Sequence, residues 1–320
     1  MRFLLRRALY SVLLLIGASL ISFLLVNLAP GDFFDQMRVN PAISRETLTS
    51  LRSQYGLDRP LPERYLQWVG SVLSGQWGFS FAYNSPAAPI ILSRGGKTLL
   101  LTGVATFWAW LIALPVGIWA AARPGSSIDW LTKGTVAVLL ATPELVLGLL
   151  FLLFAVRTGY FPAGGLVSLE SLDTDPWTET KDMAWHVFLP SVCLAAGLLP
   201  LLLSHVHAAV AEALQSPYIA AAHGHGIPLR RLLLRHALPL AANPLISLFG
   251  FSVGMLISSS LLIETIFSWP GLGQLMLEAI QQRDFFLVVD AAVLSTGFLI
   301  GGNFLADVLL YASDPRIRAA

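Results

Sequence analysis

Long apolar runs separated by shorter polar stretches dominate the chain. Six of these runs hold about 20 mainly apolar residues, which is the length that a helix needs to cross the hydrocarbon core of a membrane. We therefore predict an all-α integral membrane protein with six transmembrane helices. The predicted spans cover residues 8–29, 99–122, 134–156, 187–206, 244–263 and 286–311.

The first span follows three arginines and resembles a signal peptide in outline. Its apolar stretch is longer than the core of a signal peptide, and no convincing small-residue cleavage site follows it. We therefore expect residues 1–29 to form a retained transmembrane helix.

Arginine and lysine are distributed unevenly around the predicted spans. Short cytoplasmic loops are enriched in these residues, whereas loops longer than about 60 residues escape the rule. If the N-terminus is cytoplasmic, the short outer loops hold only Arg157, Lys181 and Arg283. The cytoplasmic side then holds Arg2, Arg6, Arg7, Arg123, Lys133, Arg230, Arg231, Arg235, Arg316 and Arg318. Both termini are therefore predicted to be cytoplasmic.

Composition agrees with a membrane location and argues against some functions. Charged residues make up 12% of the 320 residues, which is about half the share in soluble domains. The net charge of +1 gives no global field that would attract nucleic acid, so we expect no nucleic-acid partner. The single cysteine, Cys193, lies in an apolar run and is predicted to be a packing residue.

The longest segment without a span, residues 30–98, is rich in aromatic residues. It is predicted to form a small packed unit on the extracytoplasmic side. Helical spacing over residues 61–73 predicts a helix there. One side of this helix would carry Leu61, Tyr65, Trp68, Val69 and Val72.

A structured polar stretch, about residues 207–243, lies between spans four and five. The small residues 220–222 would let a helix approach another surface closely, and Gly226 is predicted to end that helix in a left-handed conformation. Three arginines, Arg230, Arg231 and Arg235, recur at helical spacing and predict a second short helix with one basic face.

This stretch resembles the cytoplasmic "EAA" loop by which the permeases of ABC importers dock on an ATPase. The similarity is closest to the permeases for peptides and nickel. The residues in register are Tyr218, Ala222, Gly226, Arg230, Arg231, Arg235, His236, Ala237, Leu238 and Pro244. The coupling loop that the resemblance implies also includes Glu212, Ala220 and Ala221.

Motifs elsewhere in the chain carry the same resemblance. Residues 55–66 resemble the family's "GLDRPL…RYL" run, residues 160–165 are also family-like, and residues 314–318 resemble its "DPRIR" tail. Residues 75–80 resemble its "GDxGxS" element, although Gln76 stands where an aspartate is usual, so a partner contact there is in doubt. An extracytoplasmic "E-x-x-F-x-x-PGLG" motif with a downstream "A-I…RD" pair includes Glu264, Pro270, Gly271, Gly273, Arg283 and Asp284.

The resemblance implies a type I ABC importer permease fold. It implies a five-helix core over residues 99–311, with the coupling loop inside it and a cytoplasmic tail at 312–320. The expected partners are a second homologous permease, one or two ABC ATPase subunits, an extracytoplasmic substrate-binding protein and membrane lipid. ATP and Mg²⁺ would bind in the partner subunits, so we expect no cofactor and no enzymatic activity in this chain.

The expected function is ATP-driven, binding-protein-dependent import of di- or oligopeptides or related solutes across a bacterial inner membrane. This subunit would form half of the translocation path. Nickel, glutathione-like and opine-like solutes stay open as alternatives. An ion-coupled secondary transporter would need paired halves with interrupted helices and charges near the midplane. Only Glu144 is a candidate for such a charge, and an intramembrane enzyme would lack a nucleophile and a base.

Two further patterns suggest ligands and are weighed against simpler interpretations. Residues 95–98 read Gly-Gly-Lys-Thr like the end of a phosphate-binding loop, but Ile91 stands where that loop needs its first glycine. Lys97 is instead expected to mark the start of span two. The histidine pairs at 205/207 and 223/225 have no carboxylate or cysteine near them in sequence, so no metal site is predicted.

Charged and small residues inside the spans complete the analysis. Glu144 either lines the translocation path or pairs with the second permease, since an ionisable group within a span is a functional candidate. Asp290 and Asp307 are expected near the ends of span six, within reach of water. The pairs Gly250/Gly254 and Gly297/Gly301 predict close packing between helices. The acidic outer loop 157–186 is either a solvated loop or a contact for a binding protein.

Overall fold

A computed structural model describes residues 2–31, 33–34, 45–54, 56, 58–171 and 175–313. Tyr55 and Leu57 of the first family-like run, Asp173 of the acidic loop and the tail motif at 314–318 lie outside the described residues.

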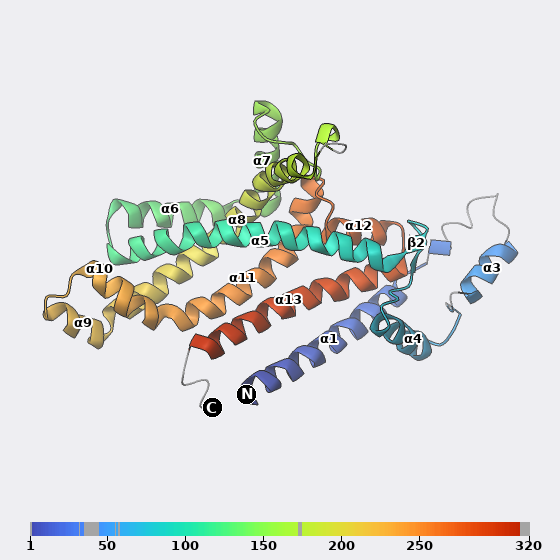
Figure 1. The fold of residues 1–320 in the computed structure, drawn as a ribbon, viewed down its shortest axis with the longest axis horizontal. Coiled ribbons are helices and arrows are strands. Elements are labelled where there is room, and N and C mark those ends of the chain that lie inside the picture. Colours follow the sequence, from blue (N-terminus) through green and yellow to red (C-terminus); the bar gives the residue numbers. More distant parts are fainter. Residues whose placement is uncertain are drawn as a thin grey trace. The chain divides into compact units, whose positions relative to one another are not determined.

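The regular secondary structure of the described residues consists of helices and one pair of short strands, each two residues long (Figure 1). The strands β1 (Phe79–Ser80) and β2 (Ser85–Pro86) pair antiparallel, with Phe79 opposite Pro86. The helices are α1 (Arg2–Leu28), α3 (Arg45–Gln54), α4 (Leu61–Leu73), α5 (Ala87–Ala122), α6 (Ser127–Ala141), α7 (Glu144–Thr158), η1 (Leu169–Ser171), α8 (Pro176–Gln215), α9 (Pro217–Gly224), α10 (Leu229–Leu232), η2 (Leu233–Ala237), α11 (Leu238–Ile266), α12 (Leu272–Gln281) and α13 (Phe285–Ser313). The all-α prediction is confirmed.

Within the described residues, five helices are long and apolar enough to cross a membrane, and α6 with α7 makes a sixth span if the bent pair is counted as one. The predicted third span, residues 134–156, is not one continuous helix, because the chain bends by 100° between α6 and α7. Thr142 is extended, with φ −97° and ψ 114°, and Pro143 follows it. Proline disfavours helical backbone in the residue before it and cannot donate a helical hydrogen bond, so the helix stops there.

Contacts between Cα atoms divide the chain into two compact units. The first comprises residues 1–11, 99–269 and 298–320, and the second comprises residues 12–98 and 270–297. These packing units are not the four functional segments predicted from the sequence, and the bounds of those segments stay a prediction.

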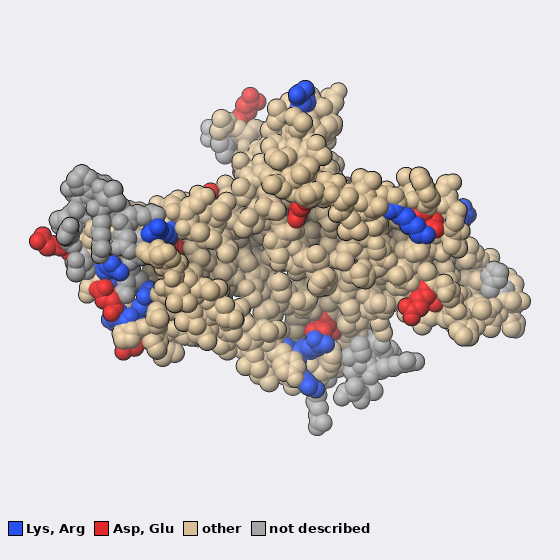
Figure 2. Space-filling model, turned by 180° about the vertical axis from the view of Figure 1, so that it is seen from behind, with Lys and Arg blue, Asp and Glu red and all other residues tan. Residues whose placement is uncertain are grey.

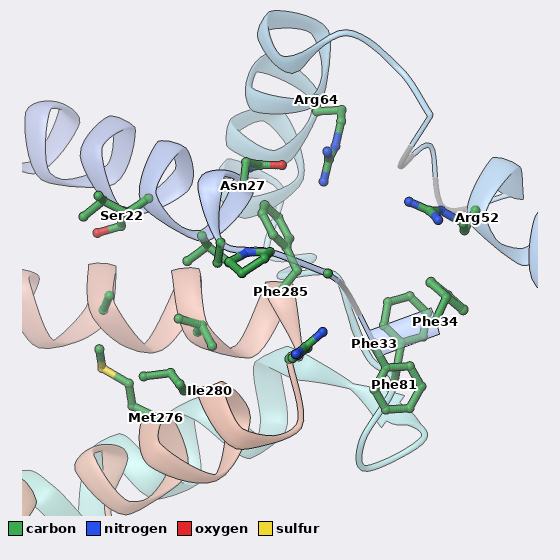
Figure 3. A pocket seen from close by; sticks show the side chains of 18 residues that line it. Ser22, Asn27, Phe33, Phe34, Arg52, Arg64, Phe81, Met276, Ile280 and Phe285 are labelled. Carbon is green, nitrogen blue, oxygen red and sulfur yellow. The ribbon is translucent and has the colours of Figure 1, made fainter. Parts of the chain in front are cut away.

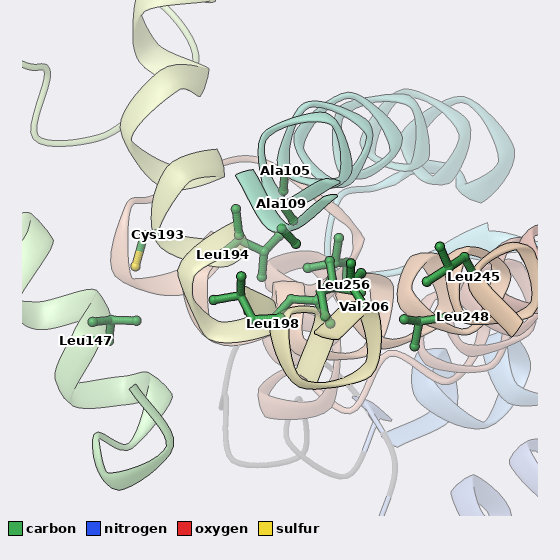
Figure 4. Packing of buried hydrophobic residues seen from close by; sticks show 14 of the residues in the cluster. Ala105, Ala109, Leu147, Cys193, Leu194, Leu198, Val206, Leu245, Leu248 and Leu256 are labelled. Carbon is green, nitrogen blue, oxygen red and sulfur yellow. The ribbon is translucent and has the colours of Figure 1, made fainter. Parts of the chain in front are cut away.

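The core of the first unit is built around α8 (Figure 4). Its most apolar stretch is 72% buried, whereas that of α1 is 11% buried, as expected for a helix that faces lipid. The alanines Ala105, Ala109 and Ala113 of α5 are fully buried in this core. One turn further along, a Cβ on Gly117 would lie 2.8 Å from the Val206 side chain of α8. This stripe of small residues lets α5 and α8 pack closely.

Helices α11 and α13 also approach closely, within the first unit. A Cβ on Gly250 would lie 2.4 Å from the Ala306 side chain, and one on Gly254 would lie 3.2 Å from Leu299. The packing role predicted for this glycine pair is confirmed. A Cβ on Gly297 or on Gly301 would meet no atom of the described residues within 4 Å, and the neighbouring Gly302 makes the close contact instead.

The second unit packs around the aromatic side chains Phe23 and Trp68, together with Val289. Helix α4 has the predicted bounds, and Trp68 is 5% exposed at the centre of its apolar side. The Trp68 indole donates to Asp290 Oδ1 at 2.7 Å, and Asp290 is 1% exposed. The expectation that Asp290 reaches water is therefore wrong, because Asp290 is buried and accepts a hydrogen bond from Trp68 of α4.

The structure also tests the sequence-based predictions for Lys97, Asp307 and Cys193. Helix α5 begins ten residues before Lys97, so residues 95–98 are helical and Lys97 does not mark the start of the helix. In the first unit, Asp307 lies 3.5 Å from Arg7 and keeps part of its side chain exposed. Cys193 is fully buried among apolar side chains, as predicted. Figure 2 shows that residues other than Lys, Arg, Asp and Glu form most of the visible face, as lipid contact requires.

Candidate functional site

The predicted coupling loop is a folded structure that joins α8 to α11 (Figure 1). Helix α8 ends at Gln215, and the next residue, Ser216, is extended, with φ −63° and ψ 143°. Pro217 then opens α9, where its missing N–H removes no hydrogen bond. The Ser216 hydroxyl accepts from the Ile219 N–H at 3.4 Å and so caps α9. The sequence Ser-Pro therefore turns the chain at the end of α8.

Gly226 ends the α9 segment with a positive φ of 81°, as predicted. A side chain at this position would have open space around it, so the conformation, and not crowding, requires glycine. The predicted second short helix differs in form. Residues 229–232 are α-helical, residues 233–237 form a π-helix, and both continue into α11.

Three apolar side chains hold the loop against the first unit's core. Ile219 is 2% exposed, Leu232 is 1% exposed and Ala237 is fully buried, and all three belong to the same cluster as the residues of α8 and α11. Ala222 is half-buried and packs against that cluster. The loop is therefore part of the helix bundle and not a loose connection.

The opposite side of the loop is exposed and basic. Exposed positions in the predicted coupling set are Glu212, Tyr218, Ala220, Ala221, Gly226, Arg230, Arg231 and Arg235. No aspartate or glutamate occurs between residues 213 and 263, so nothing in the loop's own sequence balances the three arginines. The exposed leucines Leu229 and Leu234 lie between them in sequence. This surface suits a partner with acidic side chains around an apolar patch.

A hydrogen bond connects the two ends of the loop. The Tyr218 hydroxyl lies 2.9 Å from His236 Nδ1, and the centres of the two rings are 5.7 Å apart. Tyr218 stands in the first turn of α9, and His236 stands in the π-helix. The pair thus fixes α9 to the start of α11. This contact joins two residues that the sequence placed in one motif but did not pair.

A polar cluster around Asp129 was not predicted from the sequence. Asp129 is 3% exposed and accepts from the Gly125 N–H and from Lys133 Nζ, both at 2.9 Å. His207 Nε2 of α8 lies 3.3 Å from its other oxygen. Ser126 and Asp129 have the spacing of a helix cap, and Asp129 and Lys133 are one turn apart, but neither signal indicates a contact with α8. The cluster ties the loop between α5 and α6 to α8.

Glu144 is the first residue of α7, directly after the bend. Its side chain is partly buried, and Ser259 of α11 is among its polar neighbours. A Cβ built on Gly197 of α8 would lie 3.8 Å from the Glu144 carboxyl group. Glu144 therefore contacts two other helices of its own chain. Neither of its two predicted roles is tested by this contact.

Family-like motifs far apart in sequence meet in each unit. In the first unit, the Gly165 N–H donates to Phe267 O at 2.9 Å, and a Cβ on Gly164 would lie 2.4 Å from the same oxygen. Glu264 is fully buried, and its carbonyl accepts from the Trp269 N–H at 2.8 Å. The motif that starts at Glu264 is thus held against the turn at residues 160–165.

In the second unit, Asp284 gathers three donors. Its Oδ2 accepts from the Ser80 hydroxyl at 2.8 Å and from the Ala82 N–H at 3.0 Å, while Oδ1 accepts from the Leu287 N–H at 3.4 Å. Asp284 is fully buried, whereas Arg283 is exposed with a positive φ of 54°. In the "RD" pair, Asp284 therefore connects the β1–β2 turn to the start of α13, whereas Arg283 faces outward.

The remaining residues of the extracytoplasmic motif shape the start of α12. Gly271 is buried and precedes the first residue of that helix. The Leu272 N–H donates to the Thr98 hydroxyl at 2.8 Å. Pro270 and Gly273 are half-buried beside it.

Comparison with known proteins agrees with this architecture. Residues 113–319 match the family model described as "Binding-protein-dependent transport system inner membrane component", and residues 1–102 match the corresponding N-terminal model. The chain belongs to this family. Its members are inner membrane components of binding-protein-dependent transport systems, so this chain is a multi-pass membrane permease component.

Two peptide permeases match this chain over nearly its whole length. The oligopeptide transport system permease protein AppB of Bacillus subtilis is 34% identical over 318 residues, which cover 99% of both chains. The dipeptide transport system permease protein DppB of Escherichia coli is 31% identical over 335 residues, with the same coverage. A chain of the MetNI methionine ABC transporter in an inward-facing conformation has a TM-score of 0.57 at 21% identity, over 70% of this chain and 96% of that chain. The type I importer permease fold is therefore confirmed.

Proposed function

We propose that this chain is the translocation subunit of an ATP-driven importer of di- or oligopeptides. Its partners would be a second permease, one or two ABC ATPase subunits and an extracytoplasmic binding protein. The peptide substrate is supported by the names of the relatives, which are oligopeptide and dipeptide permeases. ATP and Mg²⁺ would be bound by the ATPase subunits, and no step of hydrolysis is assigned to this chain.

The observation that carries the proposal is the two-sided construction of the loop at residues 216–237. One side is anchored in the helix core through Ile219, Leu232 and Ala237, and the other side presents three exposed arginines. A docked ATPase would push on the exposed side, and the buried side chains would transmit the displacement to α8 and α11. Close packing favours movement of these helices as a body between two packed states.

We also propose that the loop at 216–237 and both termini face the cytoplasm. The distribution of arginine and lysine supports this orientation. Single cysteines at two exposed positions, Leu73→Cys and Leu169→Cys, should react with an impermeant thiol reagent in intact cells. The Ala220→Cys variant should not react, and all three require a Cys193→Ser background. Labelling of Ala220→Cys from outside would reverse the orientation and end the docking proposal.

Gly226→Val tests the coupling role directly in the reconstituted complex. Valine at a φ of 81° costs roughly 1–2 kcal/mol, so the loop should leave its docked conformation. We expect the complex to assemble but to lose most of its substrate-stimulated ATP hydrolysis and its peptide uptake.

Two control variants distinguish the effect of a new side chain in the loop from the effect of backbone strain at a positive φ. Gly224→Val places the same side chain in open space in the same loop, without a positive φ, and should keep most coupling. Gly75→Val imposes the same strain, at a φ of 81°, outside the loop and should leave coupling unchanged in the protein that folds. Normal coupling in Gly226→Val would refute the proposed role of the loop.

A further inference from the structure

A groove of about 350 Å³ lies between α11 and α13 in the first unit. Its exposed lining residues are Phe251, Met255, Ser258 and Asn303. Gly254 also lines the groove, and it is buried beside Leu299 of α13. The two helices therefore touch at this glycine, and the larger side chains on either side of the contact leave a hollow between them.

The groove differs from a surface that contacts lipid. On α1, every exposed position between residues 12 and 28 is apolar. On α11 and α13, by contrast, Ser258 and Asn303 are exposed inside the predicted spans. Asn303 is eight residues from the nearer end of the span 286–311, which is about 12 Å of helix. Its amide therefore cannot reach water at the membrane surface, and hydrocarbon would offer it no hydrogen bond.

A helix of another subunit would find a better docking surface elsewhere on α13. Membrane helices pack on small residues, which let their backbones approach closely. The pair Gly297/Gly301 offers such a surface, because a Cβ on either residue would meet no atom of the described residues within 4 Å. Gly301 is about 160° around the helix from Asn303, since successive residues are about 100° apart. The glycines beside the groove already serve the contact between α11 and α13, and they are Gly250, Gly254 and Gly302.

The groove is connected to the loop at residues 216–237. The π-helix at the end of that loop continues directly into α11. Helix α13 is held against α11 at Gly250, where Ala306 leaves no room for a side chain. Displacement of the loop would therefore move both walls of the groove together. The wall of a path that opens to the two sides of the membrane in turn requires this kind of connection.

The second unit contains a larger cavity, of about 690 Å³, but its charged side chains have partners within the chain (Figure 3). Arg52 lies 3.9 Å from Asp58. The guanidinium carbon of Arg64 lies 5.1 Å from the centre of the Phe285 ring. These arginines support the fold of the second unit, whereas the polar groups of the groove face outward.

We propose that the groove is part of the translocation path and binds the main chain of the imported peptide. This inference rests on the proposed import of peptides. The Asn303 amide can donate to a peptide carbonyl and accept from a peptide N–H. The Ser258 hydroxyl donates to Gly254 O at 3.2 Å and keeps lone pairs that can accept from the peptide. Phe251 and Met255 would contact the peptide's side chains, and methionine adapts to many shapes.

Uptake by the complete transporter in proteoliposomes, with its binding protein, tests the role of Asn303. The probes are trialanine and the two tripeptides that carry a central lysine or glutamate between alanines. Asn303→Leu removes the amide, and uptake should fall about tenfold, by the same factor for all three peptides. Leu305→Ala changes an exposed residue of the same helix that does not line the groove, and it should keep wild-type uptake.

Reaction of single cysteines with a water-soluble thiol reagent tests the location of the groove. Both variants are made in a Cys193→Ser background. Asn303→Cys should react, and trialanine with the binding protein and ATP should slow the reaction. Leu13→Cys, at a position of α1 that is 55% exposed, should not react because it faces lipid.

Defined results would overturn the inference. One is wild-type uptake by Asn303→Leu, and another is a loss confined to peptides of one charge, which would assign the contact to a side chain. A third is no reaction at Asn303→Cys in a transporter that imports trialanine. A fourth is a disulfide from Asn303→Cys to the second permease, which would make the groove a subunit interface. Failure of the wild-type transporter to import any of the three peptides would refute the proposed function, and the inference with it.

Discussion

The loop at residues 216–237 and the turn that leads into α13 are both short connections between helices, but they bury opposite kinds of side chain. The loop buries Ile219, Leu232 and Ala237 and exposes its arginines. The turn buries the Asp284 carboxylate with three donors and exposes Arg283. Apolar contact is non-directional, whereas hydrogen bonds to a buried carboxylate require fixed distances and angles.

This difference matches what the two regions would have to do. A loop held by apolar side chains can move together with the helices on which it packs without leaving polar groups unpaired. A turn held by a buried carboxylate loses charge-assisted hydrogen bonds if it moves, so it stays rigid. We infer that the loop is built to transmit displacement and that the turn is built to resist it. The following predictions test this contrast, from the largest effect to the smallest.

Asp284→Ala should have the largest effect, and it should be on stability. The substitution leaves the Ser80 hydroxyl and the N–H groups of Ala82 and Leu287 without their acceptor in a buried site. We expect a loss of about 3 kcal/mol or more, seen as a lower melting temperature of the purified complex and a lower yield.

Ser80→Ala removes one donor and keeps the carboxylate, so it should lose less, about 1–2 kcal/mol. Asp58→Ala is a suitable control because Asp58 is largely exposed. In the protein that folds, each variant should retain its ratio of transport to ATP hydrolysis. A specific loss of that ratio at normal stability would place Asp284 in the coupling mechanism and remove the contrast.

Glu144→Gln should have an intermediate effect. The Glu144 side chain lies near Ser259 and close to Gly197, so the substitution weakens a contact among α7, α8 and α11. Glutamine keeps an acceptor, and the expected loss is about 1 kcal/mol, with uptake of cationic, neutral and acidic peptides reduced equally. The measurements are the melting temperature of the complex and uptake sorted by peptide charge.

Ser259→Ala provides the control for Glu144. If the two residues act through one hydrogen bond, the double variant should lose no more stability than the larger single loss. Selective loss of cationic peptide uptake at an unchanged melting temperature would instead place Glu144 in the translocation path. A stability loss that appears only in the assembled complex would favour pairing with the second permease.

Local features were predictable from the sequence because they depend on local backbone chemistry. Helix α4 follows from the spacing of Tyr65, Trp68 and Val72, and the positive φ of Gly226 follows from its place after a helix. The burial of Cys193 follows from its apolar neighbours. Five of the six predicted spans also followed from length and hydropathy alone, and the sixth corresponds to the bent pair α6 and α7.

Features that join distant segments were not predictable in this way. Ser80 and Asp284 are 204 residues apart, and nothing near either indicates that they meet. Asp290 stands near the start of α13, and nothing near it in sequence indicates that it is buried with a hydrogen bond from Trp68, 222 residues away. The bend after Thr142 was missed because prolines do not always break membrane helices. Pro115, Pro190 and Pro244 lie inside continuous helices here.

Tyr218→Phe should have the smallest effect and should alter coupling without altering stability. The substitution removes the hydroxyl that lies 2.9 Å from His236 Nδ1 and keeps the ring against the imidazole. Tyr218 is 61% exposed, so water replaces much of the lost hydrogen bond and the cost should be a few tenths of a kcal/mol. Such a cost changes an equilibrium by up to about twofold. We expect an unchanged melting temperature and up to about a twofold lower ratio of peptide uptake to ATP hydrolysis.

His236→Ala, which removes both the hydrogen bond and the ring contact, should lower that ratio further. If Tyr218→Phe instead lowers the melting temperature as much as Ser80→Ala does, the tyrosine is a structural support of α9, and the loop is a rigid element like the turn at Asp284.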